Sequence, residues 1–182
     1  MRFVTSCGRP YDALMSNARW KPSVTVAAVV ERAGRYLLVE EHTPEGLKLN
    51  QPAGHLDPGE SPQQAVVREC LEETARAFVP QALLGVYLAR FERPARAGQA
   101  AEDITYLRFA YSGTVGEPEP GRALDTPIVR TLWLTPDELR AQAQRLRSPL
   151  VLRCIDDHAA GVRHALDAVQ ADASLQQPWR LV

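Results

Sequence analysis

The chain has few cysteines, and the few it has are poorly placed for a shared role. Cys7, Cys70 and Cys154 are the only three among 182 residues, and they form no C-x-x-C pair. An odd number of isolated cysteines fits neither a disulfide framework nor a cysteine-ligated zinc site. We therefore expect a protein of the reducing cytoplasm.

Long hydrophobic runs are also missing. The longest apolar stretch, residues 24–30, is interrupted by Thr25 and followed by Glu31. A membrane-spanning helix needs about 18 or more apolar residues, so none is expected. Residues 1–7 lack the apolar segment of a secretory signal. The sequence therefore predicts no association with a membrane.

An excess of charge of one sign is the third absence. Lys and Arg total 21 against 22 Asp and Glu, which leaves a formal net charge of -1. No overall positive field attracts a nucleic acid polymer or an anionic membrane, so neither partner is expected. A polyanionic small molecule would have to be bound by local positive groups or by a metal ion.

The composition that remains is that of an ordinary folded domain. Hydrophobic residues make up 45% of the chain and charged residues 24%. A chain of this length buries a core without disulfide support. We expect one main domain over residues 20–172, an N-terminal extension without periodic pattern over residues 1–19, and a C-terminal tail over residues 173–182.

Strand signals begin just after the extension. Short β-branched runs at residues 24–30 and 36–39, separated by a turn-like segment, predict a hairpin. Further strands are expected over residues 84–91, 104–115 and 128–134. About ten residues separate the first two of these, which is enough for a loop that lines a site.

Three helix starts share one pattern, a hydroxyl residue followed by proline. The pairs are Ser61-Pro62, Thr135-Pro136 and Ser148-Pro149. In each pair the hydroxyl is expected to cap the helix and proline to occupy its first position. The resulting order of strands, helix, strands and two helices predicts an α/β fold with a mixed sheet and helices packed on it.

The first of these helices has an unusual charge pattern. On a helix over residues 61–78, Glu69, Glu72 and Glu73 share one face. Like charges at this spacing repel each other. Either the face is solvated, as most such clusters are, or it holds a divalent cation such as Mg²⁺, which prefers oxygen ligands. The opposite face is a predicted core stripe of Val67, Cys70, Leu71, Thr74 and Phe78.

The segment before this helix distinguishes the two interpretations. Gly54 is followed after five residues by Glu60, and seven further residues lead to the run Arg68-Glu69-Cys70-Leu71-Glu72-Glu73. This spacing resembles the Nudix box, the loop-helix-loop signature of Nudix hydrolases. Six fixed identities match, and with residue types near 6% of average usage this arises by chance on the order of once in 10⁵ chains.

The resemblance implies a fold, a cofactor and a set of site residues. The fold is a Nudix-type α/β/α sandwich, whose mixed β-sheet carries the catalytic loop-helix-loop. The cofactor is Mg²⁺, with Mn²⁺ as a substitute. Glu69 is the implied general base, Glu60 a further ligand, orienting group or base, and Arg68 a partner that holds the carboxylates or forms a structural salt bridge. The implied metal ligands are Glu69, Glu72, Glu73 and the carbonyl group of Gly54.

Two positions depart from the family pattern. Ala75 stands where the box has its last glycine, and Arg76 stands where an aliphatic residue is usual. The left-handed conformation that glycine adopts at this position costs alanine roughly 1 kcal/mol more than it costs glycine. We therefore expect the helix to continue toward Phe78 and to stop at Pro80.

The residues before the box resemble one branch of the family. The segment Leu49-Asn50-Gln51-Pro52-Ala53 is similar to that of phosphatase-type Nudix hydrolases, which release terminal phosphate from nucleoside di- and triphosphates or act on thiamine-related pyrophosphates. The expected partner is therefore a small phosphorylated molecule. Asn50 and Gln51 are candidates for binding its base, or for capping the loop backbone. Arg108 either binds its phosphate or lies at an exposed sheet edge.

Two other functions stay open at this point. One is a Nudix pyrophosphatase acting on ADP-ribose or another nucleoside-diphosphate-linked substrate. The other is a non-catalytic nucleotide-binding module, which would be expected to have lost box carboxylates, whereas none is missing here. Three acids outside the box, Glu102, Asp103 and Asp125, are either solvated or supply one more group to the site.

Overall fold

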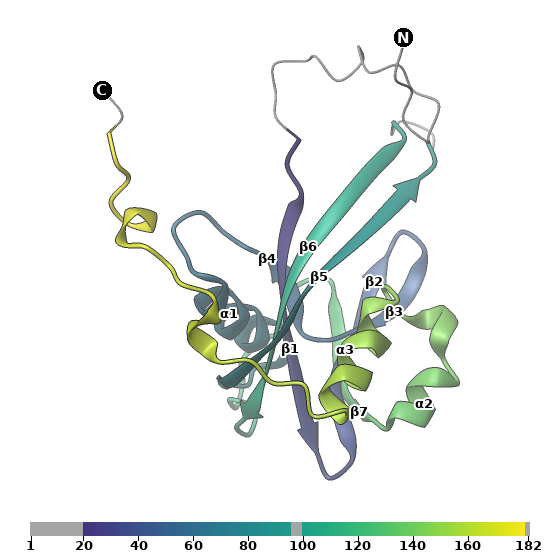
Figure 1. Cartoon of the computed structure of the whole chain (residues 1–182). Helices are drawn as coiled ribbons and strands as arrows, with labels where there is room; N and C mark the ends of the chain where they lie inside the picture. The colour runs from purple at the N-terminus through teal and green to yellow at the C-terminus, as the bar shows by residue number, and fades with distance from the viewer. Residues whose placement is uncertain (1–19, 96–99, 181–182) are drawn as a thin grey trace.

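The computed structural model describes residues 20–95 and 100–180, and Figure 1 shows their arrangement. The extension expected over residues 1–19 lies outside the described residues. Seven strands form one sheet. They are β1 (Ser23–Arg32), β2 (Arg35–Thr43), β3 (Gly46–Asn50), β4 (Ala53–His55), β5 (Phe78–Arg93), β6 (Glu102–Val115) and β7 (Ile128–Leu134).

The sheet is mixed, as the sequence predicted. Its main path runs β3-β2-β1-β6-β5, while β4 pairs with β1 and β7 pairs with β2. Strands β1 and β6 are parallel, and the other pairs are antiparallel. Because β1 has neighbours on both sides, its residues form the centre of the fold.

Helices cover both faces of the sheet (Figure 1). They are α1 (Pro62–Thr74), α2 (Pro136–Arg140) and α3 (Leu150–Ala159), with single 3-10 turns at Ala143–Arg145, Leu166–Ala168 and Ala173–Leu175. No helix in the described part of the chain is long and apolar enough to cross a bilayer.

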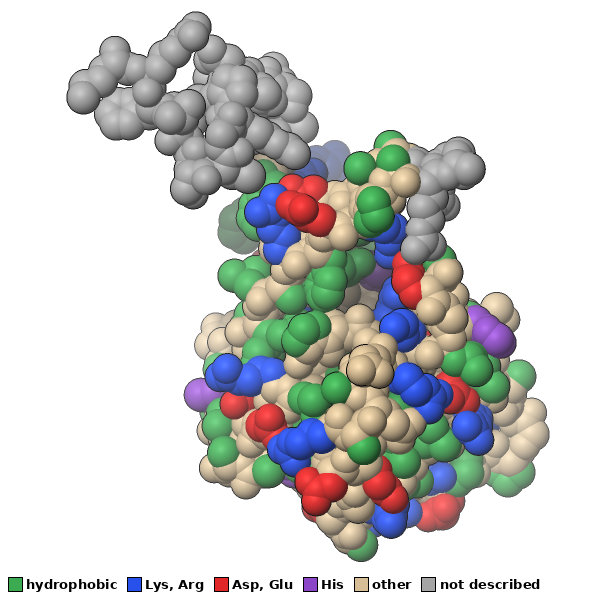
Figure 2. Space-filling model, turned by 90° about the vertical axis from the view of Figure 1, so that its right-hand side faces the viewer, with side chains coloured by type: hydrophobic (Ala, Val, Ile, Leu, Met, Phe, Trp, Pro, Cys, Tyr) green, Lys and Arg blue, Asp and Glu red, His purple; other side chains and the backbone are tan. Residues whose placement is uncertain are grey.

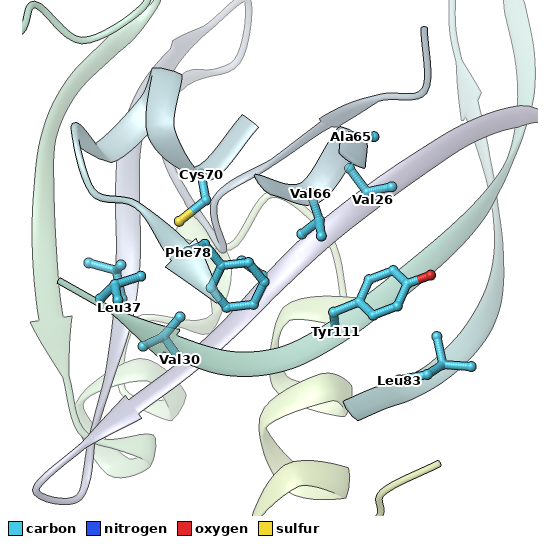
Figure 3. Close-up of a cluster of buried hydrophobic side chains, with 11 residues drawn as sticks. Val26, Val30, Leu37, Ala65, Val66, Cys70, Phe78, Leu83 and Tyr111 are labelled. Carbon is cyan, nitrogen blue, oxygen red and sulfur yellow. The ribbon is translucent and has the colours of Figure 1, made fainter. Parts of the chain in front are cut away.

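Alternation along β1 divides the core between the two faces. Val26, Ala28 and Val30 pack toward α1, while Ala27 and Val29 pack toward α3. Figure 3 shows the α1 side, where the side chains of the helix meet those of the strands beneath. The two helical layers and the sheet between them form the expected sandwich.

Strands β5 and β6 continue past the body of the domain as a two-stranded arm (Figure 1). Their pairing runs from Phe78 opposite Val115 to Arg93 opposite Glu102. The arm is longer than the strands that the sequence predicted, and it leans over one side of the sheet. Its inner face lines the pocket described below.

The predicted continuation of the first helix to Phe78 is wrong. Helix α1 ends at Thr74, and Ala75 takes the left-handed conformation with φ 55°, donating its N–H to the carbonyl of Leu71 at 2.9 Å. Phe78 instead begins β5, and its ring is buried in the α1-side core (Figure 3). Burying a phenylalanine gains about 2–3 kcal/mol, which exceeds the roughly 1 kcal/mol cost at Ala75.

Two other helix details also differ from expectation. Cys70 and Thr74 of the predicted core stripe are buried and Val67 packs against the core, but Ala65 and Val66 are buried as well, which the prediction did not include. Ser61 and Thr135 cap their helices as expected. At the third start Pro149 occupies the cap position and α3 begins at Leu150, whose N–H donates to the Ser148 hydroxyl at 3.2 Å.

The last part of the chain crosses α1 and the loop before it (Figure 1). Gln63 in α1 donates from Nε2 to the carbonyl of Leu166 at 2.9 Å. Gln176, in the segment expected to be a tail, donates to the carbonyl of Gly59. The C-terminal residues therefore brace the loop that leads into α1.

The β1–β2 turn gives a test of backbone strain. Ala33 and Gly34 link the paired residues Arg32 and Arg35, and both have positive φ, 51° and 76°. A two-residue turn of this kind prefers asparagine to alanine at its first position. Because Ala33 is exposed, Ala33→Asn loses no packing and is expected to raise the free energy of unfolding by about 0.5–1 kcal/mol. Urea unfolding measures this free energy, and a lower value for the variant than for the wild type would contradict backbone strain at Ala33.

Candidate active site

The predicted catalytic and metal-ligating residues lie on β4, on the loop that follows it and on α1. A capping box fixes where the helix starts: the Ser61 hydroxyl accepts from Gln64 N–H at 3.2 Å, and Gln64 Oε1 accepts from Ser61 N–H at 2.8 Å. Strand β4, absent from the sequence prediction, pairs with β1 through Thr25 opposite His55. Three residues with a glycine carry too little pattern to be recognised as a strand. Together β4 and α1 hold the box on two rigid elements.

Arg68 is the centre of the acidic cluster. Its guanidinium makes two hydrogen bonds to Glu60, at 2.6 and 3.1 Å, and one to Glu69 at 2.7 Å. It also donates to Glu72 at 3.1 Å and to the carbonyl of His55 at 3.0 Å. We name these five contacts the Arg68 clamp. It draws three carboxylates from the loop and the helix around one cation, which supports the predicted holding role of Arg68.

The clamp divides the carboxylates by their proton affinity. Hydrogen bonds from Arg68 hold the pKa of Glu60 below its usual range. Burial raises the pKa of Glu69, and repulsion from Glu72 and Asp57 adds to this effect, although Arg68 opposes it. Glu60 is therefore a fixed anion, whereas Glu69 takes up a proton more readily.

Glu73 is the most strongly perturbed acid of the cluster. Burial raises its pKa to about 8, with further contributions from the charges of Glu69, Glu41 and Asp125. The N–H of Ala53 donates to Glu73 Oε2 at 2.8 Å, which offsets part of this cost. No cationic side chain pairs with Glu73 among the described residues. A buried carboxylate of this kind is stabilised by a nearby cation.

Gly54 lies against the carboxylate of Glu69. A Cβ atom at this position would fall 2.1 Å from the Glu69 carboxyl carbon and 2.2 Å from both its oxygens. Only glycine therefore leaves room for the carboxylate beside the β4 backbone.

The donor set fits a hard divalent cation. Carboxylate and carbonyl oxygens are the ligands that Mg²⁺ prefers. The observation in favour of a cation is Glu73, whose pKa is raised by burial and whose one hydrogen bond within the described residues comes from a neutral N–H group, that of Ala53. No three acidic, histidine or cysteine side chains of the described residues already stand together as ligands. The Arg68 clamp explains this, because it engages Glu60, Glu69 and Glu72. Binding a cation there requires the carboxylates to exchange contacts with Arg68.

One of the three acids outside the box is brought to the cluster. Asp125 N–H donates to the carbonyl of Glu72 at 3.0 Å, and the Asp125 charge raises the pKa of Glu73. Glu102 and Asp103 lie on the arm instead, where they pair with Arg93 at 2.6 Å and Arg90 at 2.7 Å. Only Asp125 is therefore placed to add a carboxylate.

A pocket of about 500 Å³ opens next to the cluster, under the arm. In the space-filling view the surface below the arm is hollowed, and Lys and Arg side chains lie along it (Figure 2). The lining comes from β2, β3, β4, the inner face of the arm and the segment that starts α3. Gly54 and His55 line it as well, and Gly54 lies against Glu69 on its other side, so the pocket and the acidic cluster adjoin at β4.

Predicted substrate residues have different places relative to this pocket. Asn50 and Arg108 line it, and Arg108 is only 8% exposed. Gln51 does not: its side chain is 1% exposed and donates to the carbonyl of Val151 at 2.8 Å. We therefore correct the assignment of Gln51 as a substrate ligand, since this hydrogen bond anchors the chain to α3.

Glu41 is a pocket residue that the sequence reasoning missed. Burial raises its pKa, while Arg147, Asn50 and Arg108 act in the opposite direction. Its Oε1 lies 3.6 Å from Arg147 Nε and makes no hydrogen bond. The available signal was a pair of adjacent acids, Glu40 and Glu41, inside an apolar strand, where one of them must face inward.

Comparisons with known proteins agree with this geometry. A model of the NUDIX domain matches residues 20–154. Phosphatase NudJ from Escherichia coli K12 is 33% identical over 150 residues, which are 82% of this chain and 92% of the relative. The solved structure of a NUDIX hydrolase from Nitrosomonas europaea is 50% identical with a TM-score of 0.71, covering 84% of this chain and 98% of that one.

A more distant structure shows that the fold is shared beyond these relatives. It is the MutT NUDIX hydrolase from Burkholderia pseudomallei, 24% identical with a TM-score of 0.57, covering 76% of this chain and 98% of that one. All six fixed identities of the box are present, and β4 and α1 bring them together. The chain therefore belongs to the Nudix family and is an enzyme that hydrolyses pyrophosphate bonds.

Proposed function

We propose that the enzyme is a Mg²⁺-dependent phosphohydrolase that releases terminal phosphate from nucleoside tri- and diphosphates or from thiamine-related pyrophosphates. The observation that carries the proposal is a pocket large enough for a nucleoside that adjoins, at Gly54, a cluster of partly buried carboxylates. The name of the relative, Phosphatase NudJ, supports release of phosphate rather than cleavage of an internal linkage.

The cluster divides into groups with different tasks. Glu69, Glu72, Glu73 and the Gly54 carbonyl would hold Mg²⁺, with Mn²⁺ as a substitute. When bound, the ion neutralises phosphate charge and stabilises the leaving oxygen. Glu69 would take a proton from the attacking water, because its raised pKa brings a carboxylate closer to the range useful for a base.

The remaining box residues position these groups. Arg68 touches three carboxylates and would orient them without contacting the substrate. Glu60, fixed by Arg68 and by the N–H of Asp57 at 2.7 Å, would orient Arg68 in turn. The cytoplasm is the proposed location, and the free, buried thiols of Cys70 and Cys154 support it.

A substrate panel with product identification tests this proposal. Phosphate release from nucleoside tri- and diphosphates, thiamine diphosphate and ADP-ribose is measured with Mg²⁺. Glu72→Gln is expected to lower kcat at least 100-fold, on the order of 3 kcal/mol in the barrier, because it removes a metal ligand. Glutamine at position 72 still accepts the Arg68 hydrogen bond, so the fold is kept.

Glu117→Gln is the matched control. Its side chain is 78% exposed and pairs with Arg32 on the surface, so kcat is expected to stay within twofold. Release of nucleoside monophosphate and pyrophosphate, or cleavage of ADP-ribose alone, would contradict the phosphatase proposal. Full activity of Glu72→Gln would contradict the metal site.

A further inference from the structure

The floor of the pocket holds polar atoms that make no hydrogen bond to any described residue, although one of them, Glu41 Oε1, lies 3.6 Å from Arg147 Nε. Arg108 Nε and Nη1, Glu41 Oε1 and Asn50 Oδ1 are all buried and make no hydrogen bond within the described residues. A buried polar group without a hydrogen-bond partner destabilises the folded state, and a charged one does so more strongly. Atoms of this kind on a pocket floor indicate a ligand that supplies the missing hydrogen bonds.

These three side chains offer one donor group and two acceptor atoms to a ligand. A guanidinium only donates, so Arg108 requires an acceptor oxygen or nitrogen. Glu41 Oε1 and Asn50 Oδ1 accept hydrogen bonds, so they call for N–H or O–H donors. All three side chains line the same pocket, and the side chain of Asn50 hydrogen-bonds the carboxylate of Glu41. A ligand that fits must present an acceptor and donors side by side.

The wall of the pocket favours a flat ring. Tyr106 packs edge-on against Phe91, with ring centroids 5.8 Å apart, and the ring centroid of His55 lies 6.3 Å from that of Tyr106. All three residues line the pocket. Aromatic side chains of this kind stack on a heterocyclic base.

The floor lies on the opposite face of the sheet from the acidic cluster. Arg108 and its strand neighbour Thr25 line the pocket, while Ala110, two residues along the same face of β6, packs toward α3. Glu69 projects from α1 against Gly54 on the other side of β4. With the phosphates at the cluster, as proposed above, Arg108 is left for another part of the ligand.

We propose that Glu41, Asn50 and Arg108 bind the base of the nucleotide and select guanine. The proposal rests on the proposed nucleotide phosphohydrolase function. The guanine edge presents one carbonyl oxygen followed by two N–H donors. Arg108 donates to the carbonyl, and the two acceptors on Glu41 and Asn50 receive the N–H groups.

Other bases leave part of the floor unpaired. Adenine has no carbonyl, so Arg108 is left with a ring nitrogen as its acceptor. Cytosine has a carbonyl but no ring N–H, and uracil has one N–H between two carbonyls, so one acceptor of the floor stays empty. A site built to hydrogen-bond a group rejects analogues that lack it, because its own buried atoms remain unpaired.

The test compares nucleotides that differ only in the base. Phosphate release is measured for GTP, ITP, UTP, ATP and CTP, and kcat/KM for GTP is expected to be at least 10-fold above the values for ATP and CTP, with ITP between. The β,γ-imido analogues of GTP and ATP, titrated by calorimetry, are expected to show the same order in Kd. This second readout does not depend on turnover.

Two variants assign the preference to the floor. In Glu41→Gln the single amide oxygen is used by the hydrogen bond from the Asn50 side chain, so the amide N–H₂ group faces the guanine donors. Kd for the GTP analogue is therefore expected to rise at least 10-fold and Kd for the ATP analogue less than threefold. Arg108→Lys keeps the charge but loses the planar fork, and is expected to reduce the GTP preference as well. Glu117→Gln serves again as the control.

Each outcome separates the two proposals. Hydrolysis of several nucleotides without preference for GTP, or with preference for ATP, overturns the guanine proposal and leaves the phosphohydrolase proposal intact. A GTP preference that persists in both variants also overturns the assignment to this floor. Failure to hydrolyse any nucleotide, together with activity on thiamine diphosphate or ADP-ribose, overturns the nucleotide proposal on which this inference rests.

Discussion

Replacing Glu73 by glutamine is expected to stabilise the metal-free protein and to inactivate the enzyme. Burial raises the pKa of Glu73 to about 8, so its ionised form is held at a cost above that pH. Glutamine is neutral and still accepts the Ala53 N–H. We expect the free energy of unfolding at pH 8.5 to rise by about 1–3 kcal/mol, with kcat at least 100-fold lower.

The gain depends on pH in a defined direction. The folded-state pKa of Glu73 lies above its ordinary value, so the wild type carries no penalty below about pH 4.5, where the carboxyl is protonated in both states. Its stability is lost as the pH rises from there through about 8. The difference between Glu73→Gln and wild type is therefore expected to be small near pH 5 and largest above pH 8.

Thermal unfolding with and without Mg²⁺ measures both effects. Each 1 kcal/mol corresponds to about 2–4 °C in Tm for a chain of this size. Added Mg²⁺ is expected to raise the Tm of the wild type at pH 8.5 and to raise that of Glu73→Gln less, because the ion binds the folded state through this carboxylate. A variant that is less stable than wild type at pH 8.5 would show that Glu73 has a cationic partner.

Alanine in place of Gly54 is expected to lower kcat at least 100-fold while the protein still folds. The added Cβ would lie 2.1 Å from the Glu69 carboxyl carbon, so the carboxylate must move. Because this group is the free end of a flexible side chain, the fold can adjust. A displacement of about 1 Å in a reacting group is enough to cost on the order of 100-fold in rate.

Gly116→Ala is the matched control for this change. A Cβ on Gly116 meets no atom within 4 Å, so the same substitution is expected to leave kcat within twofold. Circular dichroism and Tm establish that Gly54→Ala is folded before its rate is compared. Wild-type kcat in Gly54→Ala would mean that Glu69 works from another position than the one beside β4.

The box was predictable because its information is local. Spacing along one loop and one helix places Glu60, Arg68 and the three further glutamates together, whatever the rest of the chain does. The sandwich fold and its mixed sheet followed from the order of strands and helices and from the family resemblance. Ser61 and Thr135 marked their helix starts correctly for the same local reason.

The pocket floor was harder to predict from the sequence, because it depends on pairing between strands that are far apart in the chain. Arg108 stands beside Thr25 only through the parallel contact of β6 with β1, and Glu41 arrives from β2. The sequence suggests that Gln51 binds substrate, but in the structure its amide donates a hydrogen bond to the Val151 carbonyl in α3. Ala75 adopts a left-handed conformation that alanine disfavours. Burial of the Phe78 ring outweighs this cost. Local propensity alone therefore predicts a longer helix than the structure has.

The Arg68 clamp has a consequence for how the enzyme responds to its ionic surroundings. The Arg68 guanidinium already makes five hydrogen bonds to the acidic side chains and the His55 carbonyl. A metal ion that binds these carboxylates therefore has to displace some of the hydrogen bonds. Because Mg²⁺ has to replace part of the interaction with Arg68, the free energy of Mg²⁺ binding is less favourable than it would be for carboxylates without a cationic partner. Occupancy should therefore track the ambient magnesium concentration instead of remaining permanently saturated.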